Sequence, residues 1–242
     1  VSLPNYRTET RYPAFHDIVR LELQKNFDEK ELRTKGLAVE TNLDPVLQDS
    51  LEKNLQKTKL QLIKKYGSRL DELEGAAIAV DISSGEVKAI AGSTKPSSYG
   101  FNRSINAIRP IGSLVKPFIY LTALDKYNDY NLTTLLDDSK LSLVSGGKVW
   151  EPDNFDKKFH GEIPLHVALW QSYNIASARL GIDLGYEAVE NMFLNLGIKK
   201  DVPNYPSLFI GSFELSPYQA IQAYQTIASD GCYSPLRSIR QI

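Results

Sequence analysis

The sequence predicts a mixed α/β fold of the α+β kind, in which an antiparallel strand pair precedes a largely helical body. Its 242 residues, 42% apolar and 24% charged, suffice for one sizeable core with an appendage. Residues 75–81 and 86–91 are short apolar segments separated by Ser83-Ser84-Gly85, a pattern typical of a β-hairpin. Longer segments with helical periodicity follow.

The segment before the hairpin has the composition of a linker that packs on a larger body. A short amphipathic helix is expected before Gly36, and residues 37–42 predict a strand. A second helix is expected to begin at Pro45, with Asp44 as its N-cap, and to reach about Tyr66. Its expected buried stripe consists of Val46, Leu47, Leu51, Leu55 and Leu62.

Four further helices are expected after the hairpin. They cover residues 113–126, 165–184, 186–196 and 216–229. The last two are expected to stop at Gly197 and Gly231, because glycine favours the left-handed conformation in which many helices end.

The composition excludes several classes of function. Lys plus Arg total 28 and Asp plus Glu 29, so no global charge favours nucleic acid. The lone Cys232 cannot form an internal disulfide, and no apolar run is long enough to cross a bilayer. The histidines lack metal-ligand spacing: His16, His160 and His166. We expect no metal and no cofactor, and both chain ends are expected to be cut from something longer.

Three Ser-x-x-Lys pairs occur, where about one is expected by chance: Ser50 with Lys53, Ser113 with Lys116, and Ser145 with Lys148. Only Ser113 opens an apolar helix, which Leu114 and its neighbours are expected to bury all round. Burial lowers the pKa of a lysine, so Lys116 is a candidate base for the Ser113 hydroxyl. The alternative is a core helix that Ser113 merely caps.

A Ser-x-Asn pair, Ser172 with Asn174, lies in a helix-rich stretch, unlike the second such pair at Ser104. A hydroxyl there can relay a proton between Lys116 and a leaving amine, and the Asn174 amide can orient the lysine. The alternative is a helix–loop junction capped by Ser172.

The order of these motifs resembles the transpeptidase domain of bifunctional (class A) penicillin-binding proteins. The motifs are Arg109-x-x-Gly112-Ser113-x-x-Lys116-Pro117, Trp150-x-Pro152-x-Asn154 and Ser172-x-Asn174. Thr41-Asn42-Leu43-Asp44-Pro45 with Gln48 is similar to the segment that joins this domain to a glycosyltransferase domain. The resemblance implies a linker over 1–74 and, over 75–242, the N-terminal part of a transpeptidase domain. That part would be a helical subdomain with an incomplete antiparallel sheet.

The resemblance also implies a reaction. Ser113, deprotonated by Lys116, would attack the penultimate D-alanine of a peptidoglycan stem peptide, and an amine of a neighbouring stem would resolve the acyl-enzyme into a cross-link. Ser172 and Asn174 would assist proton transfer and substrate placement. β-Lactam antibiotics would acylate Ser113 as mimics of the D-alanyl-D-alanine end.

The remaining implications concern binding and surroundings. Trp150 and Asn154 are expected to shape the rim of the cleft. The parent protein is expected to carry a glycosyltransferase domain and a membrane anchor, and to act in the cell envelope on the periplasmic face of the inner membrane. The family's active site also has a Lys-Thr-Gly or Lys-Ser-Gly motif after the serine-lysine and Ser-x-Asn motifs, and neither sequence occurs in the 242 residues. We therefore expect an open edge on the hairpin and little activity from a chain that ends at Ile242.

Two other readings use the same serine and lysine. A serine β-lactamase needs a deacylating base, and Glu190 with Asn195 have a spacing of five where one such class has four. A non-catalytic β-lactam sensor or assembly scaffold would keep the fold and act through partners. Hydrolysis of a chromogenic cephalosporin would favour the lactamase.

Overall fold

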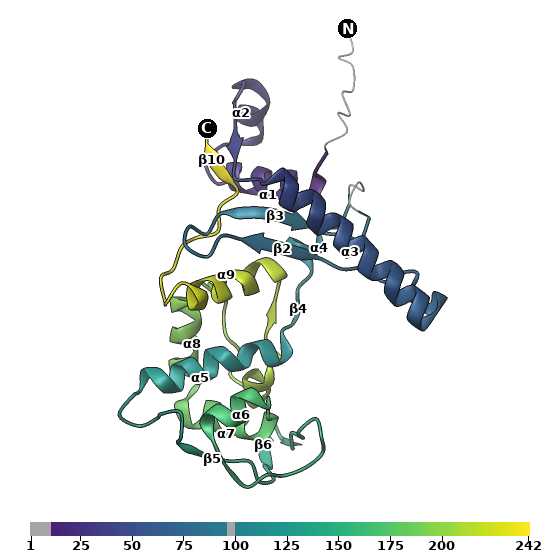
Figure 1. Cartoon of the computed structure of the whole chain (residues 1–242). Coiled ribbons are helices and arrows are strands. Elements are labelled where there is room, and N and C mark those ends of the chain that lie inside the picture. Colours follow the sequence, from purple (N-terminus) through teal and green to yellow (C-terminus); the bar gives the residue numbers. More distant parts are fainter. Residues whose placement is uncertain (1–10, 96–99) are drawn as a thin grey trace. The chain divides into compact units, whose positions relative to one another are not determined.

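The structure is a computed structural model that describes residues 11–95 and 100–242 (Figure 1). The first ten residues of the predicted linker, and residues 96–99, lie outside these ranges. The chain divides into two compact units, one formed by 1–107 with 216–242 and the other by 108–215. The chain therefore leaves the first unit once and returns to it.

The predicted hairpin is confirmed in the first unit. Strands β2 (Ala77–Val80) and β3 (Val87–Ala91) pair antiparallel with Ile78 opposite Ile90. The Asp81 carboxylate organises the turn between them, because its Oδ1 accepts hydrogen bonds from the hydroxyl and the N–H of Ser83.

Helix α3 (Pro45–Tyr66) begins as predicted after Asp44, whose Oδ1 accepts from the N–H groups of Val46 and Leu47 at 2.9 and 3.0 Å. The predicted buried stripe is wrong at its first two residues, whereas Leu51, Leu55 and Leu62 are partly buried. Val46 is 80% exposed, Leu47 is also exposed, and the residue that α3 buries completely is Gln48. The stripe fails because the helix contacts the sheet mainly through strand β3 and leaves much of its surface to solvent.

Gln48 explains how α3 is attached to the sheet. Its Nε2 donates to the carbonyl of Ile90 at 2.8 Å, and its Oε1 accepts from the Ile90 N–H at 2.8 Å. A side-chain amide thus forms the two bonds that a neighbouring strand would otherwise form. At Ile90 the edge of β3 is therefore covered by α3.

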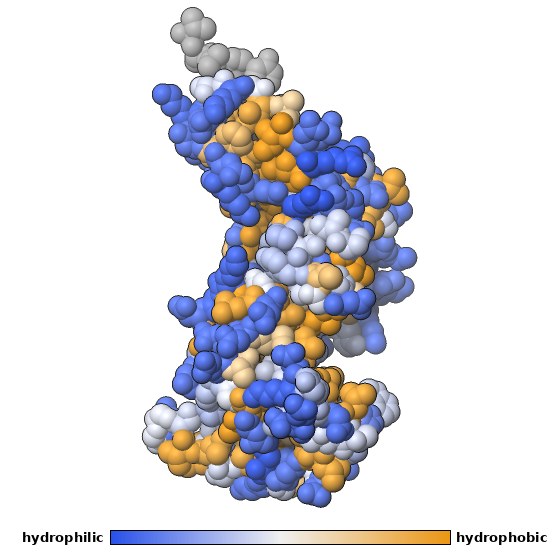
Figure 2. Space-filling view, turned by 90° about the vertical axis from the view of Figure 1, so that its left-hand side faces the viewer, coloured by the Kyte–Doolittle hydropathy of each residue, from blue (hydrophilic) through white to orange (hydrophobic). Residues whose placement is uncertain are grey.

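The other elements of the first unit surround this hairpin. They are α1 (Pro13–Leu23), α2 (Glu29–Thr34), β1 (Glu40–Thr41), η1 (Ser68–Leu70), α4 (Arg103–Asn106), α9 (Pro217–Ala228) and β10 (Ile239–Gln241). The strand expected over 37–42 is only two residues long and pairs with β10. The core contains Phe15, Ile18, Val87, Ile90 and Leu236. Figure 2 shows apolar side chains gathered near the top of the view, on this unit.

The second unit is mainly helical. Its helices are η2 (Gly112–Val115), α5 (Lys116–Asp125), α6 (Leu165–Trp170), α7 (Asn174–Leu184), α8 (Tyr186–Asn195) and η3 (Pro206–Ile210). Its strands are β4 (Arg109–Pro110), β5 (Leu135–Asp137), β6 (Leu143–Ser145), β7 (Lys148–Trp150), β8 (Glu162–Pro164) and β9 (Glu214–Leu215). Phe193 joins Phe118 and Phe213 in the core, with ring centroids 5.7 and 5.2 Å apart.

Two helix predictions for this unit need correction. The helix expected over 165–184 is broken between α6 and α7, and the first turn of the helix expected over 113–126 is a 3₁₀ turn. Both departures occur at predicted site residues.

Replacing Gln48 with leucine is expected to lower the free energy of unfolding by about 2–4 kcal/mol, because two buried backbone groups of Ile90 lose their partners. Gln56→Leu, on an exposed position of the same helix, is the matched control and is expected to change it by less than about 0.5 kcal/mol. Urea unfolding followed by circular dichroism measures both. Equal effects of the two substitutions would contradict the assigned role of Gln48.

Candidate active site

Ser113 lies in a tight turn just before the helix. In η2 the Lys116 N–H donates to the carbonyl of Ser113, while Pro117 has no N–H for the four-residue bond of an α-helix. Residues three apart in a 3₁₀ turn stand one above the other, so Ser113 and Lys116 lie on one side of it. Ser113 is exposed, whereas Lys116 is 1% exposed. Leu114 is 51% exposed, so the helix is not buried all round as expected.

Two glycines hold the backbone that leads into Ser113. Gly112 has a φ of 55°, and its N–H donates to the carbonyl of Gly211 at 2.9 Å. The preceding N–H, of Ile111, donates to Phe213 at 2.9 Å. A Cβ on Gly211 would lie 1.9 Å from the carbonyl oxygen of Gly112. This close approach therefore requires glycine at position 211.

The Lys116 ammonium is held by oxygen atoms of two predicted site residues. Its Nζ donates to the main-chain carbonyl of Ser172, to Ser172 Oγ at 3.0 Å and to Asn174 Oδ1 at 2.7 Å. Burial lowers the pKa of Lys116 from 10.5 to about 8, and the negative charge of Asp138 opposes that shift. With this pKa, roughly a tenth of the lysine is neutral at pH 7.

Ser172 reaches Lys116 because the chain reverses at the end of α6. Ser172 has a φ of 57°, its N–H donates to Leu169, and the N–H of Tyr173 donates to Ala168. This is the Schellman arrangement that usually has glycine at the left-handed position. A serine there is strained, but it points both a carbonyl and a hydroxyl at Lys116.

Asn154 and Asp138 fix the start of α7, which carries Asn174. Asn154 Oδ1 accepts from the N–H groups of Asn174 and Ile175 at 2.7 and 3.2 Å. Asn154 Nδ2 donates to Asp138 Oδ2 at 2.6 Å, and Asp138 Oδ1 accepts from the Ala176 N–H at 3.1 Å. Two side chains from outside the helix therefore satisfy three N–H groups of its first turn.

His160 completes this network. Its Nδ1 lies 2.7 Å from Asp138 Oδ2 and its Nε2 lies 3.1 Å from Asp156 Oδ2. The imidazole stacks on Tyr173 with ring centroids 4.1 Å apart. His160 thus lies between two carboxylates beside the reversal at Ser172.

Sequence reasoning missed Asp138, because Leu135-Leu136-Asp137-Asp138 shows no alternation of apolar and polar residues and the alternation appears only in the structure. Along β5 exposed and buried residues alternate, with Leu135 and Asp137 exposed and Leu136 buried. Continuing this alternation by one residue places Asp138 inside. An acidic residue on the buried side of a strand indicates a partnered carboxylate.

The two residues expected at the cleft rim have different surroundings in the structure. Trp150 is half-buried and packs against the cluster of Leu141, Ile175 and Ala178. Asn154 is 2% exposed and is bonded as described above. A substrate contact of either residue stays a prediction.

The other serine motifs lie in different surroundings. Ser50 is exposed on α3, and Ser145 lies at the turn of the β6–β7 hairpin. Ser104 is buried in α4 and its hydroxyl donates to the carbonyl of Ala91 at 2.8 Å. Among the residues that the structure describes, none of these three hydroxyls is hydrogen-bonded to a lysine ammonium.

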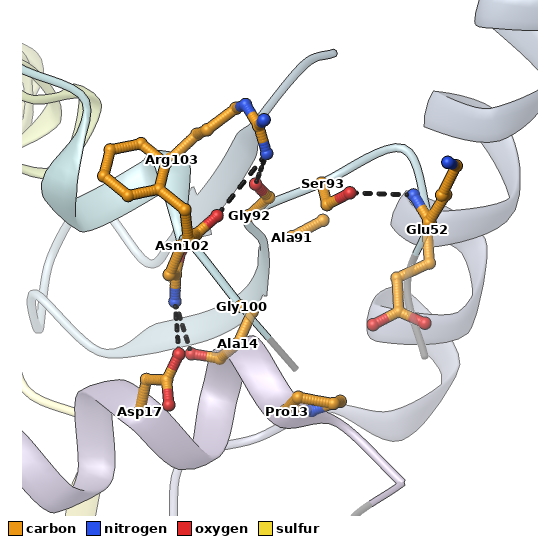
Figure 3. A pocket seen from close by; sticks show the side chains of 12 residues that line it. Pro13, Ala14, Asp17, Glu52, Ala91, Gly92, Ser93, Gly100, Asn102 and Arg103 are labelled. Carbon is orange, nitrogen blue, oxygen red and sulfur yellow. Dashed lines mark hydrogen bonds between the residues drawn. The ribbon is translucent and has the colours of Figure 1, made fainter. Parts of the chain in front are cut away.

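The first unit has a polar pocket, lined in part by Asp17, Ser93, Asn102 and Arg103 (Figure 3). Its groups bind one another. Asn102 Nδ2 donates to Asp17 at 3.2 Å, and Glu74 accepts from Ser93 at 2.8 Å and forms an ion pair with Arg103 at 3.6 Å. This network joins the elements of the first unit, and the candidate reactive groups lie in the second.

Within residues 11–95 and 100–242, no group of three or more His, Cys, Asp or Glu side chains is placed to hold a metal ion. No helix in those ranges is both long and apolar enough to span a membrane.

Comparison with known sequences identifies the family. The family described as "Penicillin binding protein transpeptidase domain" matches residues 75–242. Penicillin-binding protein 1B of Vibrio cholerae is 43% identical over 96% of this chain, and that of Escherichia coli is 38% identical over 95%. The chain spans about 30% of the length of these relatives.

Solved structures support the same fold. The chain resembles the PonA1 protein of Mycobacterium tuberculosis in complex with penicillin V, with a TM-score of 0.74 at 23% identity over 95% of this chain and 62% of the other. Penicillin-binding protein 1A of Haemophilus influenzae gives a TM-score of 0.59 at 29% identity over 63% of this chain and 23% of its own. The predicted fold class is confirmed, and the chain belongs to the penicillin-binding protein transpeptidase domain family.

Proposed function

We propose that this chain supplies the acylating serine site of a peptidoglycan D,D-transpeptidase. The observation that carries the proposal is a buried lysine with a pKa of about 8, one 3₁₀ turn after an exposed serine. Ser172 and Asn174 contact the same ammonium. A nucleophile, a base and a group that orients the base are therefore present in one unit.

The acylation step uses neutral Lys116 as the general base. Ser113 Oγ attacks the carbonyl carbon of the penultimate D-alanine while its proton moves to Lys116. The bond to the terminal D-alanine then breaks, and the leaving nitrogen takes a proton from Lys116, directly or through the Ser172 hydroxyl. The products are an acyl-serine ester and free D-alanine, with Lys116 neutral again.

The second step transfers the acyl group. The amine of a neighbouring stem peptide attacks the ester carbonyl and loses a proton to Lys116, which returns it to Ser113 Oγ as that oxygen leaves. The result is a peptide cross-link and free enzyme. A β-lactam acylates Ser113 by the same first step, but its leaving nitrogen stays tethered.

The family also suggests which further domains, cellular location and ligands the parent protein has. Because this chain resembles the transpeptidase part of bifunctional (class A) penicillin-binding proteins, the parent protein is proposed to carry a glycosyltransferase domain and a membrane anchor. It is proposed to act on the periplasmic face of the inner membrane, where the stem peptides are. Peptidoglycan stem peptides and β-lactams are the proposed ligands.

Labelling of the gene product that contains these residues by a fluorescent penicillin is expected to be lost on Ser113→Ala, because the ester oxygen is removed. Ser50→Ala and Ser145→Ala, in the two other Ser-x-x-Lys pairs, are the matched controls and should retain wild-type labelling. Gel fluorescence and mass spectrometry of the labelled peptide provide the measurement. Persistent labelling of the Ser113→Ala protein would rule out the assignment, and turnover of a chromogenic cephalosporin would favour a β-lactamase.

The rate of acylation is expected to rise with pH and to level off above about pH 8, because Lys116 acts as a base only after losing its proton. Below that pH each unit is expected to reduce the rate about tenfold. Lys116→Met should reduce the rate by about 10²–10⁴-fold, whereas Lys148→Met, at an exposed position, should leave it unchanged. Stopped-flow acylation between pH 6 and 9 tests this, and a flat profile would contradict it.

A further inference from the structure

We propose that Asp138 is a positioning residue of the acylation site and acts through Asn154 on Asn174 and Lys116. This inference rests on the proposed function. It assigns a role to a carboxylate outside the three sequence motifs.

The burial of Asp138 requires an explanation. The side chain is 0% exposed, and its two oxygens bind Asn154 Nδ2, the Ala176 N–H and His160 Nδ1 at 2.6, 3.1 and 2.7 Å. A carboxylate removed from water is tolerated where such partners satisfy it. Here all three partners lie around the start of α7 and the reversal before it.

The link from Asp138 to the lysine is a continuous chain of hydrogen bonds. Asp138 fixes the orientation of the Asn154 amide, since the oxygen accepting from Nδ2 determines which end of that amide faces the helix. Asn154 Oδ1 then accepts from the Asn174 N–H at 2.7 Å, and Asn174 Oδ1 accepts from Lys116 Nζ at 2.7 Å. The Asn174 amide is further held through Nδ2, which donates to the carbonyl of Asp153 at 2.8 Å.

Asp138 also acts through its charge. Its field opposes the effect of burial on the Lys116 pKa. Three other titratable groups lie near Asp138. They are His160 in the loop before β8, Asp156 on the far side of that imidazole, and Tyr120 on α5, whose hydroxyl lies 3.0 Å from Ser177 Oγ. Within the described residues neither Asp138 nor any of these three groups is hydrogen-bonded to Ser172 or Asn174, so a change in the pH profile of acylation reports on Lys116.

The test uses Asp138→Asn in the intact gene product. This substitution replaces one carboxylate oxygen with an amide nitrogen, so either Ala176 or Asn154 loses its hydrogen-bond acceptor. The resulting misplacement of Asn174 and Lys116 is expected to slow acylation by about 10²-fold. The rising limb of the pH profile should also move to lower pH, because the charge that raises the lysine pKa is gone. The matched control is Asp137→Asn, an exposed neighbour in an ion pair with Arg179, which should change neither quantity.

A double variant separates positioning from general stability. Asp138→Asn with Asn154→Asp reverses donor and acceptor across the 2.6 Å bond. The new carboxylate at 154 still accepts from the N–H groups of α7 and loses only the bond that Asn154 Nδ2 donates to the Lys158 carbonyl at 2.9 Å. We expect it to recover at least about tenfold of the lost rate. If the single variants do not fold, the double variant decides alone: folding with recovered acylation supports the proposal, and no recovery overturns it.

Other outcomes are equally decisive. A folded Asp138→Asn protein with the wild-type rate and pH limb would overturn the role of Asp138. If Ser113→Ala were labelled normally in the same experiment, the proposed function itself would fail, which is a separate result.

Discussion

The arrangement of the second unit depends on keeping one lysine ammonium out of water. A buried charge is tolerated only where hydrogen-bond acceptors replace the solvent. Ser172 and Asn174 supply these acceptors to Lys116, and they do so from the break between α6 and α7. An unbroken helix over this region would not direct the Ser172 carbonyl to the lysine, since helical carbonyls bond along their own axis.

This requirement accounts for backbone strain at Ser172, and a close approach of two backbone segments leads into Ser113 on the other side of the site. Ser172 adopts a left-handed conformation without being glycine, and Gly112 and Gly211 approach so closely that a side chain on Gly211 would collide with the opposite carbonyl. The conformation of Ser172 costs on the order of 1 kcal/mol or more and persists because the surroundings fix it, whereas glycine adopts positive φ without this cost. The Schellman bonds behind Ser172 fix its conformation, and the backbone bond from Gly112 to Gly211 fixes the close approach.

The sequence was informative where local chemistry decides the structure. The Asp44 cap and the hairpin turn follow from a few adjacent residues. Two features of the structure could not be predicted from adjacent residues. The break at Ser172 has no glycine or proline to mark it, so the helical periodicity predicted one continuous helix. The contact that stabilises the reversal comes from Lys116, 56 residues earlier in the chain. Burial of Gln48 in place of Val46 likewise depends on where strand β3 lies.

The site therefore balances two opposed effects on one group. Burial lowers the pKa of Lys116 and favours the base, while the charge of Asp138 raises it and favours the ammonium. Without the carboxylate, the neutral form would gain, but a neutral amine donates two protons at most and the ammonium donates three. The three acceptors around Nζ are thus matched to the charged resting form. With a pKa near neutrality, that form keeps the site assembled and can release a proton at little cost when Ser113 reacts.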